Sequence, residues 1–397
     1  MVKAEAVDRI RKFIAFASVT VICLNARLWS QTPSQSPHPI TLADQFATED
    51  RLRKPGWWPT KGSSPRSSYV GDTVCAQCHR DLVAVQKSSA MAQTATRAPD
   101  SELLAQYPLN FKLGQYRYQT GGKEQTAMYS VTDGSSSFSS SLQWAFGIRM
   151  GQSYLFERNR GMFMAPLTYY PEAHIWDFTV DQPHSVPETL DKAVGRHLLD
   201  AEVRGCFNCH NTAATVDDRF DPDHSIPGVT CEACHGPGAD HVSAAKAGLA
   251  ELGTTMIMNP RRLNAVDSID FCGACHRTWW DVTLSRATGL KSVRFPPYRI
   301  ENSRCWGKGD ARLTCVACHD PHRPLARDEA SYDHNCLGCH VNSAGAQPTS
   351  DHPGAPCPTA RKGCVGCHMA KYEVVDIPVK FTDHQIRVNR PNDPIPE

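Results

Sequence analysis

The sequence predicts a fold of mainly short α-helices and loops wrapped around covalently attached groups, with a small β-rich insert. Three observations lead to this expectation. A short cysteine motif recurs along the chain, hydrophobic residues make up only 41% of it, and a long stretch without cysteine, residues 101–190, alternates apolar and polar residues. Average domains are ~45–50% apolar, so we expect something besides aliphatic side chains to fill the core.

The composition excludes several classes of protein. With 397 residues and 17 cysteines, the chain is too long for a disulfide-stapled miniprotein and too rich in cysteine for an ordinary cytosolic enzyme. Its 42 Lys and Arg against 41 Asp and Glu give a net charge of +1. A nucleic-acid-binding domain usually shows a clear basic excess, so no nucleic-acid partner is expected.

Residues 1–30 are predicted to be a signal peptide or an N-terminal anchor. Lys3, Arg9, Arg11 and Lys12 precede an apolar run from Phe13 to Leu24. The run is shorter than the ~20 residues that a spanning helix needs. No clean cleavage pattern follows, so an uncleaved anchor, with membrane contact through this segment alone, stays open. In both cases the rest of the chain is expected to be exported, in the periplasm or otherwise outside the cytoplasm. The Pro- and Ser-rich residues 31–68 predict a linker.

A repeated motif explains most of the cysteines. Each of the seven C-x-x-C pairs is followed directly by histidine, and we number the motifs 1 to 7 along the chain: Cys75, Cys78, His79; Cys206, Cys209, His210; Cys231, Cys234, His235; Cys272, Cys275, His276; Cys315, Cys318, His319; Cys336, Cys339, His340; and Cys364, Cys367, His368. This is the attachment signature of c-type haem, in which both thiols form thioethers and the next imidazole binds iron.

Two other uses of C-x-x-C pairs fit less well. Zinc ribbons and thioredoxin-like sites contain such pairs, but neither requires a histidine after every second cysteine. The sequence therefore predicts seven covalently attached c-type haems, each with iron. Residues 69–100 form the predicted first haem-binding segment and residues 191–397 a hexahaem-binding domain. Because the last six motifs lie within residues 206–368, we expect their haems to be close neighbours that form much of the core.

The segments around several motifs resemble known proteins. Residues 69–79, 228–241, 315–322 and 363–369 resemble the multihaem cytochromes c. Among these, they are most similar to the tetrahaem cytochrome c family of hydroxylamine-oxidation electron carriers and to the doubled-CxxCH proteins. The resemblance implies a multihaem cytochrome c fold and a role in electron transfer. The chain departs from this family in its seven motifs and its long insert, so the family's partner is not carried over.

The cysteine-free residues 101–190 predict the β-rich insert. Tyr116-Arg117-Tyr118 and Ile175-Trp176-Asp177-Phe178 alternate apolar and polar residues, and Gly121-Gly122 and Asp133-Gly134 are typical turns. Such a pattern indicates antiparallel strands and hairpins. Two roles stay open, a surface for docking or substrate access and a structural cover over the first haem.

Histidines outside the motifs are candidates for the second axial position on each iron. His197, His224, His241, His322 and His384 are the predicted metal ligands, and His174, His184, His334 and His352 are weaker candidates. Met91 is either a ligand or a core residue. As a ligand it would give a haem of higher potential than a bis-histidine haem. Cys305 and Cys357 either pair as a disulfide or remain thiols.

The leading functional hypothesis is transfer of electrons along closely packed haems between a redox protein donor and a redox protein acceptor. Enough histidines are present to fill most axial positions, and no motif is a C-x-x-C-K variant. The alternative is a multihaem oxidoreductase with one open haem that acts on a small nitrogen or sulfur compound, for which the sequence identifies no catalytic residue. A third alternative is a docking subunit of a larger cytochrome assembly.

Overall fold

The computed structural model describes residues 64–121, 126–306, 312–340, 357, 360–390 and 393–396. Of the chain's two units, Met1–Ile40 and Thr41–Glu397, all of these residues belong to the second. The predicted export segment at residues 1–30 and nearly all of the predicted linker at 31–68 lie outside the described residues. Within the described part, no helix combines the length and the apolar character that crossing a membrane requires.

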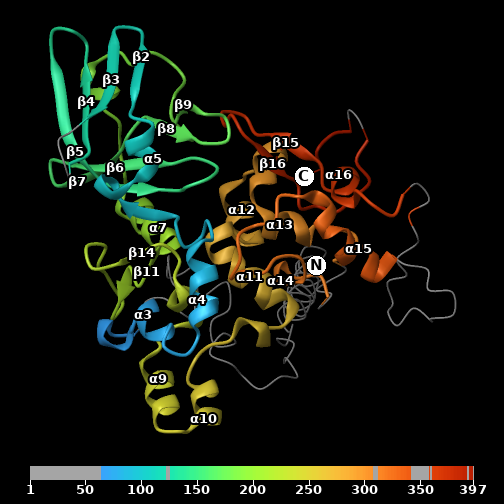
Figure 1. Ribbon diagram of the computed structural model, residues 1–397. Coiled ribbons are helices and arrows are strands. Elements are labelled where there is room, and N and C mark those ends of the chain that lie inside the picture. Colours follow the sequence, from blue (N-terminus) through green and yellow to red (C-terminus); the bar gives the residue numbers. More distant parts are fainter. Residues whose placement is uncertain are drawn as a thin grey trace, which may run out of the picture. The chain divides into compact units, whose positions relative to one another are not determined.

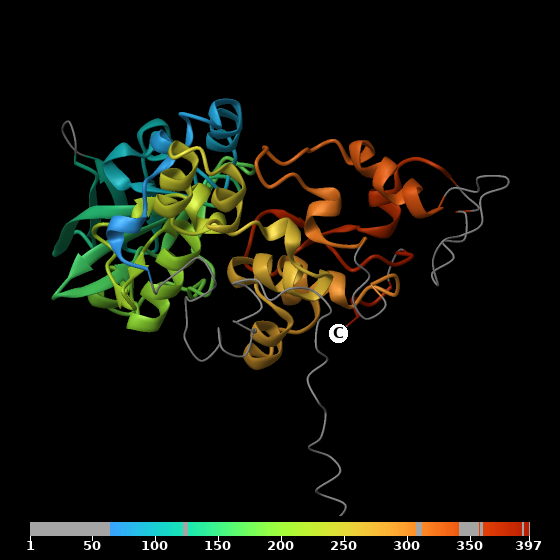
Figure 2. The same cartoon turned by 90° about the horizontal axis from the view of Figure 1, so that it is seen from below.

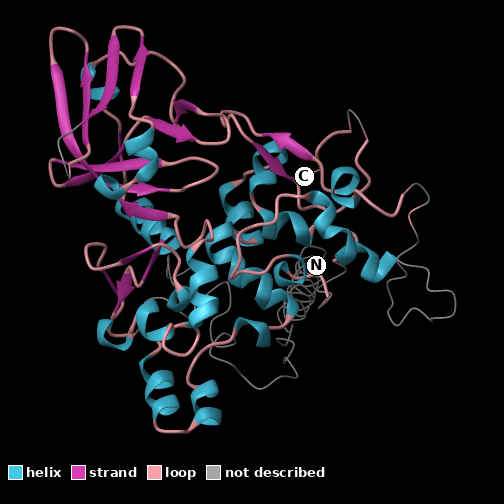
Figure 3. Cartoon of the chain, in the orientation of Figure 1, coloured by secondary structure: helices cyan, strands magenta, loops and turns pink. Residues whose placement is uncertain are grey.

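The expectation of a mainly helical fold with only a small β-rich insert is wrong. The protein is about 37% helical and 21% strand. Its largest element is an eight-stranded sheet in the order β10-β7-β6-β5-β4-β3-β2, with β1 paired to β5 (Figures 1 and 3). All of its pairs are antiparallel. The strands are β1 (Ala95–Arg97), β2 (Asn110–Leu113), β3 (Tyr116–Gly121), β4 (Met128–Thr132), β5 (Ser137–Phe146), β6 (Ser153–Arg158), β7 (Gly161–Met164) and β10 (Arg196–His197).

The sheet forms because this part of the chain supplies its own apolar core. In β3, Tyr116 and Tyr118 are buried while Arg117 between them is exposed, the alternation that the sequence shows. A bulge interrupts the pairing of β5 with β6 between Leu142 and Trp144, and bulges bend a strand. The prediction based on cysteine spacing made this sheet too small. The aromatic and β-branched side chains of the sheet bury apolar surface against one another, so the sheet does not need a haem to form its core.

Four two-stranded ladders complete the strands. They pair β8 (Leu167–Tyr170) with β9 (Ile175–Phe178), β11 (Asn211–Thr212) with β14 (Ile226–Pro227), β12 (Thr215–Val216) with β13 (Arg219–Phe220), and β15 (Lys371–Glu373) with β16 (Lys380–Thr382). After β16, the Arg387 N–H donates to the His368 carbonyl at 3.1 Å and places the C-terminal segment beside motif 7.

Short helices build the rest of the described structure. They are α3 (Asp72–Cys75), α4 (Arg80–Lys87), α5 (Glu102–Gln106), α6 (Leu190–Ala193), α7 (Asp200–His210), α8 (Cys231–His235), α9 (Ala239–Lys246), α10 (Ala250–Thr255), α11 (Ala265–His276), α12 (Trp279–Ser285), α13 (Pro296–Glu301), α14 (Cys315–Cys318), α15 (Asp333–His340) and α16 (Cys364–His368). The 3-10 helices are η2 (Arg66–Ser68), η3 (Ala98–Asp100), η4 (Pro260–Arg262), η5 (Gly289–Arg294) and η6 (Glu329–Tyr332).

Apolar clusters connect these helices to each other and to the sheet. Trp144 and Phe146 of β5 receive the edge of the Phe207 ring of α7, with centroids 5.0 and 5.2 Å away. Helices α11 and α13 pack together (Figures 1 and 2), with the buried Ile269 and Ile300 in one cluster. Motif 2 is thereby fixed against the sheet, and the helix of motif 4 against α13.

Candidate haem-attachment sites

The helices give the C-x-x-C-H motifs a common face. Residues i, i+3 and i+4 of a helix lie on one side, and this is the spacing of the two cysteines and the histidine. Motifs 2, 3, 4, 6 and 7 lie wholly within α7, α8, α11, α15 and α16, and α14 carries both cysteines of motif 5. In motif 1, α3 ends at Cys75 and Ala76 keeps a helical conformation. Two thiols and an imidazole on one side suit a covalent haem.

Cysteines of different motifs meet in three places. The side chains of Cys75 and Cys231 interact, which lowers the pKa of Cys75 and raises that of Cys231 and brings motifs 1 and 3 together. A similar interaction lowers the pKa of Cys315 and raises that of Cys272, which brings motifs 4 and 5 together. Similarly, Cys336 and Cys364 join motifs 6 and 7. Motifs that are distant in sequence thus form three adjacent pairs.

Two electrostatic interactions and one hydrogen bond link these pairs to one another. The thiol of Cys234 in motif 3 acts electrostatically on Cys272 in motif 4. Cys336 in motif 6 acts in the same way on Cys318 in motif 5. Cys209 in motif 2 donates through its Sγ to the carbonyl of Ala274 in motif 4 at 3.7 Å. The motifs therefore form one series, 1-3-4-5-6-7, with motif 2 beside motif 4.

Three motif histidines face a second histidine across a gap that fits one iron. The ring centroids are 6.4 Å apart for His79 and His241, 6.0 Å for His235 and His322, and 6.2 Å for His319 and His384. Two metal–imidazole bonds of about 2 Å each, with the half-width of each ring added, set ring centres roughly 6 Å apart across a metal ion. The residues at motifs 1, 3 and 5 thus fit bis-histidine haem.

Hydrogen bonds orient several of these imidazoles. In four histidines the Nδ1 atom lies 2.8 to 3.1 Å from a backbone carbonyl. The pairs are His235 with Met258, His241 with Gly253, His368 with Arg387 and His384 with Thr382. His210 Nδ1 lies 2.7 Å from Thr94 Oγ1. A metal-binding histidine usually donates one ring N–H to such an acceptor and leaves the other nitrogen for the metal.

Burial keeps some of these imidazoles neutral, as metal binding requires. Burial lowers the pKa of His384 to about 4, although the Thr382 carbonyl opposes the shift. The pKa values of His235 and His319 are also lowered, chiefly by burial. Neighbouring histidines lower all three further because two imidazolium ions repel each other.

The other predicted axial ligands make different contacts. The ring of His197, in β10, packs edge-on against Phe163 at 5.2 Å. His224 is 77% exposed and bonds to Asp221 at 2.8 Å. Met91 is half-buried, and its carbonyl accepts the Val229 N–H at 2.9 Å. Their role as ligands remains a prediction.

The weaker candidates are also placed, where the structure describes them. His184 stacks on Phe178 with centroids 4.3 Å apart. His334 Nδ1 lies 2.8 Å from the Ser331 carbonyl. His352 lies outside the described residues, and whether Cys305 pairs with Cys357 remains open.

Sequence reasoning missed two buried carboxylates that tie motifs together. Glu232, inside motif 3 and only 1% exposed, accepts the N–H groups of Val70, Gly71 and Gly238 at 2.8 to 2.9 Å. It is the only charged residue between the cysteines of any motif, a signal that could have identified it.

Asp333 plays the corresponding part between motifs 6 and 7. It is buried at the start of α15 and accepts the N–H groups of Gly363 and Cys364 at 2.7 and 2.8 Å. These bonds hold the first turn of α16 next to α15. Because Asp333 lies three residues before its motif, the motif pattern gave no sign of this role.

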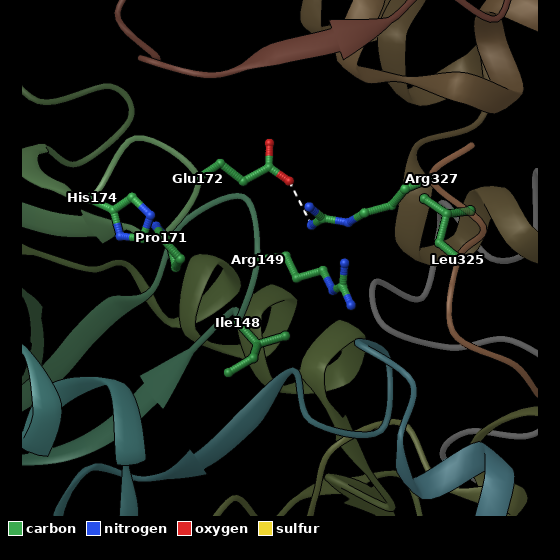
Figure 4. Close-up of a pocket in the computed structure, with 7 residues that line it drawn as sticks. All are labelled: Ile148, Arg149, Pro171, Glu172, His174, Leu325 and Arg327. Carbon is green, nitrogen blue, oxygen red and sulfur yellow. Dashed lines mark hydrogen bonds and ion pairs between the residues drawn. The ribbon is translucent and has the colours of Figure 1, made fainter. Parts of the chain in front are cut away.

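A separate pocket of about 720 Å³ lies away from these contacts, lined by Ile148, Arg149, Pro171, Glu172, His174, Leu325 and Arg327. Arg327 donates to Glu172 at 2.8 Å, and Arg149 extends toward the same part of the pocket (Figure 4). Two guanidinium groups against one carboxylate favour an anionic occupant. A small oxyanion or a haem carboxylate has the required charge.

Known proteins match parts of this chain. Residues 174–236, which include motifs 2 and 3, match the family "Cytochrome c554 and c-prime". Multiheme cytochrome MtrA of Shewanella baltica (strain OS185) is 25% identical over 226 residues. The match spans 52% of this chain and 64% of MtrA, less than two thirds of that protein.

A solved structure was also compared. The crystal structure of the outer cell wall cytochrome OcwA aligns with a TM-score of 0.46 and 15% identity, over 81% of this chain and 80% of OcwA. Independently of that alignment, the C-x-x-C-H motifs and the two sequence matches identify the chain as a multihaem c-type cytochrome.

Proposed function

We propose that this protein is an exported heptahaem cytochrome that carries electrons between redox proteins outside the cytoplasm. The observation that carries the proposal is that cysteines of different motifs lie close enough to interact, so that the attachment sites form one continuous series. Seven haems, one for each motif, agree with the helices that contain all or part of each motif. Residues 1–30 are the proposed export segment, either cleaved or kept as the sole membrane contact.

When bound, c-type haem supplies one-electron redox chemistry, and the protein tunes it through axial ligands, burial and hydrogen bonds. The chain's own contribution is to place the attachment sites. Thiol contacts bring motifs 1 and 3, 4 and 5, and 6 and 7 together in pairs. Motif 4 occupies the branch point because its residues interact with motif 2 through a hydrogen bond and with motifs 3 and 5 through their cysteines. The two ends of the longest path, motifs 1 and 7, are the proposed entry and exit.

The second axial ligands follow a regular offset. We assign His241 to motif 1, His322 to motif 3 and His384 to motif 5 from their ring separations. In sequence, these histidines follow motifs 3, 5 and 7, so each serves a motif two places earlier. The assignment of His241, which follows motif 3, to motif 1 agrees with the close approach of these two motifs. His197, His224 and Met91 remain proposed ligands for the other motifs.

Removing attachment at the branch point tests this arrangement. The variant Cys272→Ala/Cys275→Ala should carry one haem fewer by intact mass and should alter the EPR signals of the haems at motifs 2, 3 and 5. Electron flux from a dissolved reductant to an electrode holding the protein by its C-terminus should fall by an order of magnitude or more. The matched control Cys206→Ala/Cys209→Ala also loses one haem but should disturb only motif 4. Equal effects of the two variants would refute the proposed series.

A second candidate is an oxidoreductase with one open haem that acts on a small nitrogen or sulfur oxyanion, and the pocket with Arg149 and Arg327 has the charge to bind such an anion. This candidate requires a high-spin ferric haem and carbon monoxide binding to the reduced protein. If all haems are low-spin and no carbon monoxide binds, the electron-carrier proposal stands alone. If one haem binds carbon monoxide and Arg149→Gln weakens nitrite or sulfite binding, the enzyme proposal takes precedence.

A further inference from the structure

Arg299 of α13 is a fully buried cation whose hydrogen bonds converge on the C-terminal segment. Its side chain is 0% exposed. The Nε and Nη2 atoms donate to the two carboxylate oxygens of Asp383, each at 2.8 Å. Nη2 also donates to Gln385 Oε1 at 2.7 Å, and Nη1 donates to the Pro396 carbonyl at 2.8 Å and to Ser292 Oγ at 3.3 Å. These five bonds match the donor capacity of a guanidinium group.

The residues that Arg299 holds are the two neighbours of His384. Asp383 lies immediately before this histidine and Gln385 immediately after it. Two further hydrogen bonds hold Gln385. Its backbone N–H donates to Asp383 Oδ1 at 3.0 Å, and its side-chain Nε2 donates to the Asn302 carbonyl at 3.1 Å. The backbone on both sides of His384 is therefore anchored to one buried side chain.

The result of this anchoring is visible at motif 5. The His384 ring lies 6.2 Å from that of His319, and its Nδ1 is 3.0 Å from the Thr382 carbonyl. Ser303, four residues after Arg299, donates its hydroxyl to the His384 carbonyl at 3.4 Å and accepts the Ile386 N–H at 2.8 Å. The C-terminal end of α13 and the turn after it thus fix the position and the orientation of the His384 imidazole relative to His319.

We propose that Arg299 is a positioning residue that holds His384 at the iron-binding distance from motif 5. This inference rests on the proposed function, in which His384 is the second axial ligand of that motif. Burying an ion pair is a poor way to gain stability, because the desolvation of both charges opposes their attraction. A planar fork bound to a carboxylate does, however, fix direction in a way that an ammonium group cannot. Geometry is therefore what this pair contributes.

Four variants of the haem-loaded protein test the proposal. His384→Ala tests the ligand itself and should convert one haem from low-spin to high-spin. Arg299→Lys keeps the charge but loses the fork, and should change the EPR g-values and the midpoint potential of that same haem only. Arg299→Met/Asp383→Leu removes both buried charges, so it should fold even if the lysine variant does not, and it should show the same spectral change. Arg158→Lys is the control, because Arg158 forms an ion pair with the exposed Asp191.

The outcomes distinguish the assignment of His384 as a ligand from the positioning role of Arg299. If His384→Ala leaves every haem unchanged, the assignment of this ligand fails and the role of Arg299 fails with it. If His384→Ala produces a high-spin haem while both Arg299 variants keep wild-type g-values and potential, only the positioning role is refuted. A purely structural role would lower stability without changing one haem selectively.

Discussion

The imidazole rings of His235 and His322 lie within 12° of parallel, with their centroids 6.0 Å apart. His235 belongs to motif 3, whereas His322 follows motif 5 by three residues. Replacing His322 with alanine should therefore open one haem at motif 3 rather than motif 5. We expect the ferric protein to gain one high-spin haem and the reduced protein to bind one carbon monoxide, measured by EPR and visible spectroscopy. His322→Met should restore a low-spin haem at a higher potential, because methionine ligation raises the potential of haem. Unchanged spectra in both variants would contradict the pairing.

Glu232 provides a test of stability. Its carboxylate is buried and accepts three backbone N–H groups from two separate segments. Glu232→Ala leaves these donors unsatisfied and should lower the free energy of unfolding by about 3 kcal/mol or more. Denaturant titration followed by circular dichroism measures this loss. Glu188→Gln at an exposed ion pair is the matched control and should cost less than about 1 kcal/mol. Equal midpoints for the two variants would exclude a structural role for Glu232.

Glu301 should make stability depend on pH. Burial, with a smaller contribution from Asp270, raises its pKa to about 7 from 4.5. The folded protein therefore retains this proton at pH values where the unfolded chain has lost it. The stabilising effect of this proton is fully present below about pH 4.5. It falls as the pH rises toward 7, and above pH 7 the free energy of unfolding stays lower by roughly 3–4 kcal/mol at most. Glu301→Gln should be more stable than wild type at pH 8 and should flatten this slope. The matched control is Glu251→Gln at an exposed position, which should keep the wild-type dependence of stability on pH. If Glu301→Gln also keeps this dependence, another group causes it.

Phe146 should couple the sheet to motif 2. Its ring lies 5.2 Å from those of His210 and Phe207, and it is 6% exposed. Phe146→Ala removes a buried aromatic ring and should lower the free energy of unfolding by about 3–5 kcal/mol. It should also shift the spectrum of a single haem, since the His210 imidazole loses a packing neighbour. Phe146→Leu keeps most of the volume and should show a smaller loss of stability. A destabilised alanine variant with unchanged haem spectra would limit Phe146 to the sheet.

The sequence was most informative where chemistry fixes spacing. Covalent haem attachment requires two thiols and an imidazole at set intervals, so residues such as Cys231, Cys234 and His235 can be predicted as an attachment site without a structure. Alternation in the same way predicts strands such as β3 through Tyr116 and Tyr118. The size of the sheet was not predictable, because β1 and β10 are only three and two residues long and join it through backbone pairing.

The proposed pairing of the axial histidines could not be predicted from sequence spacing for a different reason. His241 follows motif 3 by six residues, yet its ring faces His79 of motif 1. Nearness in sequence therefore suggests a different partner from the one that we propose from the position of the His79 ring. The ion pair of Arg299 with Asp383 could not be predicted from the sequence either, because two residues 84 positions apart leave no local sequence pattern.

The bonds of Glu232 to Val70 and Gly71 have a consequence for the order in which the chain assembles. They join residues 162 and 161 positions apart, and the entire eight-stranded sheet lies between them. Closing so long a loop costs less entropy once the intervening chain is already compact. The sheet should therefore form first and bring the ends of the loop together, so that motif 1 reaches motif 3 late in folding. Until then the Cys75 side chain, which is only partly exposed in the folded protein, should remain fully accessible, and this would leave the most time for the proposed haem attachment at motif 1.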